Sequence, residues 1–169
     1  PFAVEVDLPI GPSVDFKYPV EDSETFVAKQ IRNAIPSPEG GRLAFTVLSE
    51  LFVMDSPDGD PERIADDLAA VQQHPSWSPD GEWIVFSGWT DAEGGHVYRV
   101  RADGRGDAEQ LTTTSAMYLE PKWAPDGSRI VVERASSRDY EEAIARGSLG
   151  EPTVLVWLPA EGGDVSLIA

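Results

Sequence analysis

The 169-residue sequence has no cysteine, only two histidines and no long uninterrupted apolar run. The absence of cysteine excludes disulfides, thiolate metal sites and a cysteine nucleophile. No window approaches the ~20 consecutive apolar residues that a membrane helix requires, and no basic flank precedes an apolar signal segment at the N-terminus. We therefore expect a soluble chain without membrane insertion.

Positive charge is also scarce, with 13 Lys and Arg against 30 Asp and Glu and a formal net charge of −17. Binding to a phosphate backbone or an anionic bilayer depends on clustered basic side chains, so we expect no nucleic-acid partner. The first residue is Pro rather than Met. This start suggests a processed form or a piece of a longer protein.

One phrase occurs three times: "SPEGGRLAFT" from Ser37, "SPDGEWIVFS" from Ser78 and "APDGSRIVVE" from Ala124. Proline presets the first corner of a turn, Asp bonds back to the backbone, and Gly accepts positive φ. The recurrence near 40 residues is typical of supersecondary repeats such as four-stranded propeller blades. The predicted turn residues are Pro38, Gly40, Pro79, Asp80, Gly81, Pro125, Asp126 and Gly127.

Short runs that are apolar on both faces follow each turn: "RLAF", "WIVF" and "RIVV". Such runs are typical of strands sandwiched between neighbouring sheets. An inner strand precedes each turn, and two further strands follow the apolar run. Trp77 and Trp123 end the second and third inner strands, where we expect each ring to pack between adjacent sheets.

These phrases, above all "HPSWSPDGEWIVF" and "LEPKWAPDGSRIVV", resemble the repeat of TolB-like six-bladed propellers, which are relatives of WD repeats. The resemblance covers Gln30 to Ala169. It implies an all-β fold, namely a propeller fragment of about three four-stranded blades. One propeller type serves many functions, so the resemblance says little about activity.

The predicted organisation has four parts. Residues 1–29 form strands of a preceding or closing blade, since Phe2 to Ile10 and Val14 to Tyr18 alternate in hydrophobicity. Residues 30–69, 70–115 and 116–169 form one blade each. The third blade is expected to carry a short helical insertion near residues 136–147. The two interpretations of this insertion are a lid or partner-contact element at the rim, and an enlarged surface loop without a specific role.

Asn33, His74 and Glu120 share one repeat position on the inner strands and are the candidate lining of a central channel. A polar ring there could hold water, a cation or a ligand; the alternative is ordinary solvation. His96 opens a strand, where we expect it to bond a neighbouring loop. No Gly-x-Ser-x-Gly elbow, metal-ligand spacing or phosphate loop is present, so we predict no catalytic residue, no metal ligand and no cofactor in this chain.

A narrower resemblance rests on three segments taken together: "DFKYPVEDSETFVAKQIRNAIPSPEGGRLAF", "GGHVYRV" and "QLTTTSAMYLEPKWAPDG". This combination is similar to the propeller part of secreted metal-dependent amidohydrolases. The resemblance implies a non-catalytic interaction, scaffold or substrate-access module of a larger hydrolase of C–N bonds. A divalent metal would then belong to the hydrolase domain, because the family's His-x-His pair is not matched here.

Two alternatives remain: a stand-alone periplasmic TolB-type propeller that binds a protein, and the gating propeller of a serine peptidase. The amidohydrolase hypothesis implies a periplasmic or secreted location. About three blades cannot close a ring, because propellers generally need about four to eight. The expected partners are therefore the remaining blades of the parent or a second copy, together with an adjoining hydrolase domain.

Overall fold

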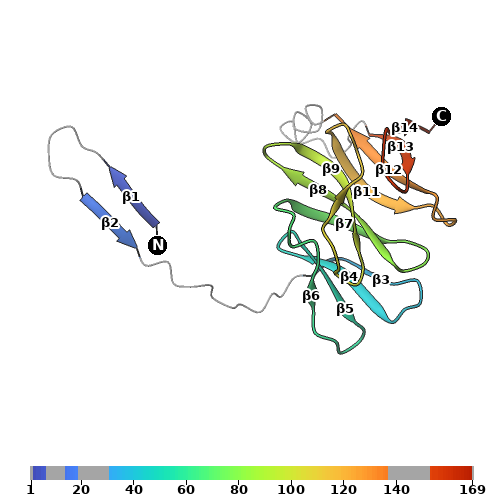
Figure 1. The fold of residues 1–169 in the computed structure, drawn as a ribbon, viewed down its shortest axis with the longest axis horizontal. Helices are drawn as coiled ribbons and strands as arrows, with labels where there is room; N and C mark the ends of the chain where they lie inside the picture. The colour runs from blue at the N-terminus through green and yellow to red at the C-terminus, as the bar shows by residue number, and fades with distance from the viewer. Residues whose placement is uncertain (1, 7–13, 19–30, 137–152, 169) are drawn as a thin grey trace.

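The structure is a computed structural model that describes residues 2–6, 14–18, 31–136 and 153–168. All regular secondary structure in these ranges consists of β-strands (Figure 1). In the described part of the chain, no helix is long and apolar enough to cross a membrane. The helical insertion predicted near residues 136–147 lies outside the described residues except for Ser136.

The N-terminal strands form a hairpin. Strand β1 (Phe2–Val6) pairs antiparallel with β2 (Val14–Tyr18), and Val4 lies opposite Phe16. The strand predicted from Phe2 to Ile10 is thus described as far as Val6.

Three four-stranded sheets make up the rest of the fold, and in each one the strands pair antiparallel in chain order. Figure 1 shows the second sheet between the first and the third. The first sheet contains β3 (Arg32–Pro36), β4 (Arg42–Val47), β5 (Glu50–Asp55) and β6 (Glu62–Arg63). The second contains β7 (Val71–Trp77), β8 (Trp83–Thr90), β9 (Gly94–Arg101) and β10 (Glu109–Gln110). The third contains β11 (Met117–Trp123), β12 (Arg129–Ala135), β13 (Val154–Pro159) and β14 (Ser166–Leu167).

The repeated phrase forms the turn between the first two strands of each sheet. In the second sheet, the N–H of Gly81 donates to the Ser78 carbonyl at 2.9 Å, and Gly81 has φ +72°. Asp80 accepts from the Ser78 hydroxyl at 2.5 Å and from the Glu82 N–H at 3.0 Å. These two donors hold the pKa of Asp80 below its usual value. Matching backbone bonds close the other two turns, which contain Pro38 and Gly40, and Pro125, Asp126 and Gly127.

Two apolar cores lie between the sheets, and β8 contributes to both of them. Ile84 and Phe86 face the first sheet, whereas Val85 faces the third, because successive side chains of a strand point to opposite faces. The central sheet is therefore apolar on both sides. The first core also contains Ala44, Leu51, Val53, Ile64, Tyr98 and Val100, and the second contains Val97, Leu111, Ile130, Val132, Val156 and Leu158.

The two repeat tryptophans differ in their polar contacts. Trp77 is buried, and its indole Nε1 donates to the Ile35 carbonyl of the first sheet at 3.2 Å. The Arg42 guanidinium lies over the Trp77 ring, 5.5 Å from its centre. Trp123 packs against the second core, but its buried Nε1 has no hydrogen-bond partner among the described residues.

Candidate functional site

Each inner strand has a β-bulge at the position predicted to line a channel. Asn33, His74 and Glu120 all have left-handed backbones, with φ of 52°, 53° and 50°. A residue other than Gly adopts this backbone conformation at a cost of about 1–2 kcal/mol. The register with the second strand shifts here in all three sheets, between Arg32 and Ile35, Gln73 and Ser76, and Leu119 and Lys122. One local geometry is thus repeated three times.

The inner strands lie close together in space, since β7 contacts both β3 and β11. His74 Nε2 lies 3.6 Å from Glu120 Oε1, across the junction between the second and third sheets. Lys122 Nζ lies 3.1 Å from the other Glu120 oxygen and balances its charge. The structure therefore brings His74 and Glu120 into contact, while Asn33 joins His74 in the pocket described below.

Burial controls the ionisation of His74. Desolvation lowers the pKa of His74 from 6.5, and it outweighs the opposite effect of the nearby Glu120 carboxylate. Lys122 lowers the same pKa further, whereas Glu133 raises it. The ring is consequently neutral at pH 7, so its approach to Glu120 is not an ion pair at that pH. His74 Nδ1 is buried without a hydrogen-bond partner in the described residues.

A second polar row lies one strand further out and was missed by the sequence analysis. Thr46, Ser87 and Glu133 pair with the residue that precedes each bulge. The Thr46 hydroxyl lies 3.3 Å from the Arg32 carbonyl and 3.4 Å from Asn33 Oδ1. The available signal was the last letter of each repeated phrase, which is polar in all three copies.

A polar pocket of about 620 Å³ opens at the junction of the first two sheets. It lies beside two of the three predicted channel residues, Asn33 and His74. The turn between β4 and β5 forms another wall, where Leu48 and Ser49 also have left-handed backbones. The remaining lining residues are Arg32, Thr46 and Gln73.

Other polar groups near the inner strands have structural partners. The fully buried Gln72 accepts from the Leu51 N–H at 2.8 Å and donates to the Ala65 carbonyl at 2.9 Å, which ties the second sheet to the first. His96 Nδ1 lies 3.0 Å from the Thr112 hydroxyl, in a neighbouring loop as predicted. Among the residues described, no group of three His, Asp or Glu side chains could hold a metal ion.

Meandering four-stranded sheets that stack face to face, with their first strands closest together, define a β-propeller. The sequence profile of the family described as "TolB beta propeller domain" (PD40) matches residues 22–156, and the chain belongs to this family. The three sheets are therefore blades. The predicted all-β fold of about three four-stranded TolB-like blades is confirmed.

Solved structures show the same fold. A TolB-type protein of Agrobacterium tumefaciens superposes with a TM-score of 0.64 at 19% identity, over 98% of this chain and 59% of that one. TolB from Acinetobacter baumannii gives a TM-score of 0.60 at 18% identity, over 83% and 32%. The propeller domain of the Trilobed protease from Pyrococcus furiosus gives 0.53 at 14% identity, over 83% and 43%. The chain thus spans only part of each solved chain.

A curated relative is similar over a shorter stretch. The uncharacterized peptidase YuxL of Bacillus subtilis is 34% identical over 58 residues, which are 34% of this chain and 9% of the relative.

Proposed function

We propose that these blades are a non-catalytic module that binds or admits the substrate or partner of a larger hydrolase. The observation that carries the proposal is the row of bulged polar residues on the inner strands, with an open pocket between two of them. Left-handed non-glycine residues are costly and cluster at functional sites. The sequence contains no Gly-x-Ser-x-Gly nucleophile elbow.

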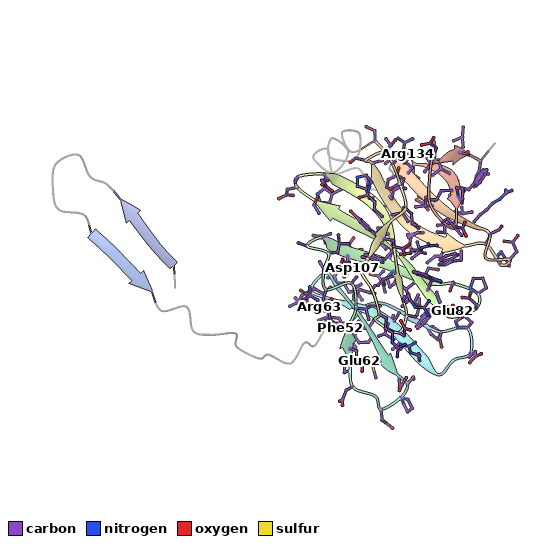
Figure 2. All side chains as sticks on the ribbon, in the orientation of Figure 1. Phe52, Glu62, Arg63, Glu82, Asp107 and Arg134 are labelled. Carbon is purple, nitrogen blue, oxygen red and sulfur yellow. The ribbon has the colours of Figure 1, made fainter. Side chains whose placement is uncertain are left out.

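The open ends of the blade stack support a larger assembly. Figure 2 labels Phe52 in the first blade and Arg134 in the third, at opposite ends of the stack. Phe52 is partly exposed, whereas its register equivalents Tyr98 and Val156 are buried. In the third blade, Leu155 is exposed and points away from the second core, to which its neighbour Val156 belongs. Further blades of a parent protein, or a second copy, would cover these apolar faces.

Two classes of hydrolase are candidates for the parent. The sequence resemblance from Asp15 to Phe45 favours a metal-dependent amidohydrolase in a periplasmic or secreted location, with any divalent metal in the hydrolase domain. The similarity to the peptidase YuxL and to a protease propeller favours the gating propeller of a peptidase. A stand-alone TolB-type protein-binding propeller is the third candidate, supported by the TolB structures.

Sequencing the parent gene on both sides of this segment separates the three candidates. An amidohydrolase parent has a His-x-His segment beyond the blades, a serine peptidase parent has a Gly-x-Ser-x-Gly elbow, and a TolB-type protein has neither. The purified 169-residue chain and the purified parent are then assayed on amide and peptide substrates, with and without added Zn²⁺. We expect turnover only by the parent. Turnover by the 169-residue chain alone would overturn the proposal.

A further inference from the structure

We propose that the pocket between the first and second blades binds a single carboxylate group, such as the C-terminal carboxylate of a peptide. The inference rests on the proposed function, because it names the chemical group that this module would recognise. It concerns Arg32, Asn33, Ser49 and Gln73, which line the pocket together with Thr46 and His74.

The pocket is rich in hydrogen-bond donors. Thr46 Oγ1 lies 3.4 Å from Asn33 Oδ1, and this contact lets Asn33 present its amide N–H groups to the pocket. The Gln73 amide and the Ser49 hydroxyl are further donors on the other walls. A carboxylate has only acceptors and can receive several such bonds.

The charge of the lining is the reverse of the charge of the chain. The net charge is −17, yet the lining has a guanidinium and no carboxylate. In the described ranges no carboxylate pairs with the exposed Arg32 guanidinium, whereas Arg63, Arg99 and Arg101 each have an acidic partner. Arg binds carboxylates through two parallel hydrogen bonds.

A single carboxylate fits this pocket better than a phosphate. One guanidinium balances one negative charge, while a dianion would leave a net negative charge inside an already acidic protein.

Isothermal titration calorimetry on the 169-residue chain tests the inference with acetyl-Ala-Ala-Ala as the free acid and as the C-terminal amide. We expect the acid to bind at least about tenfold more tightly than the amide, since a charge-assisted pair is lost in the amide. Arg32→Gln should remove this preference. Asn33→Gly should weaken binding of the acid about threefold, and Gly is chosen because it tolerates the left-handed backbone. Arg105→Gln is the matched control, because Arg105 is exposed and does not line the pocket.

Acetate and inorganic phosphate are the two further probes. Competition by acetate supports a carboxylate site that also accepts free acids, and no competition by acetate supports a site for a peptide terminus. Equal binding of acid and amide, no binding of the acid, tighter binding of phosphate, or an unchanged preference in Arg32→Gln overturns the inference. Each of these outcomes leaves the assay of the parent hydrolase unaffected, so the two proposals can fail separately.

Discussion

Leu155 in β13 and Leu51 in β5 occupy the same register position in their blades, opposite the last residue of the repeated phrase. Leu51 is fully buried against the second blade, but 50% of Leu155 is exposed. The third blade therefore presents an apolar face equivalent to those buried in the two internal interfaces.

We predict that the 169-residue chain associates with itself through this open face. Replacing Leu155 with Lys should shift the equilibrium toward the monomer, because a charged side chain resists burial in an apolar interface. Sedimentation velocity at several concentrations measures the shift. Leu48→Lys is the matched control, since Leu48 is 70% exposed in the turn between β4 and β5. Equal association of the two variants would contradict the prediction.

The two repeat tryptophans should differ in their response to the same substitution. Trp77→Phe removes the hydrogen bond to the Ile35 carbonyl and should lower the free energy of unfolding by about 1 kcal/mol more than Trp123→Phe. The Trp123 indole N–H has no partner to lose among the described residues. Urea unfolding followed by circular dichroism measures both values. The reverse order would show that the bond between blades is not a net stabilising contact.

Gln72 should be essential for stability although its neighbour Gln73 is not. Gln72→Leu leaves the Leu51 N–H and the Ala65 carbonyl without their partner in a buried position. We expect a loss of about 3 kcal/mol in the free energy of unfolding, since each unsatisfied buried group costs about 1–3 kcal/mol. Gln73→Leu is the control, with an expected change within about 0.5 kcal/mol. Similar losses in both variants would contradict this assignment.

Stability should decrease in mild acid because of His74. Burial lowers the pKa of His74 in the folded chain, so the unfolded chain binds the proton more readily. The contribution of neutral His74 to the free energy of unfolding is therefore fully present above about pH 6.5 and is lost as the pH decreases below that value. His74→Asn keeps a residue that accepts the left-handed backbone, as Asn33 shows, and should flatten this slope. Unfolding in urea between about pH 7 and pH 5 measures it, and an unchanged slope in the variant would refute the assignment.

The blades could be predicted from local chemistry alone. Within the repeated phrase, Pro79 and Gly81 favour a turn, because the proline ring and the missing Cβ act on their own backbone angles. The apolar run "WIVF" indicates a strand that is covered on both faces, and Ile84 and Val85 do face different cores. The repeat position of Asn33, His74 and Glu120 also indicated one shared environment, although not its geometry.

The sequence by itself determined the repeat, the turns and the type of each strand, because these depend on residues next to one another in the chain. Only the tertiary structure decided that Gln72 is buried while Gln73 is exposed, and that Arg32 shares a pocket with Ser49. The physical reason is that the face of a strand is assigned only when its partner strands and its bulge fix the register.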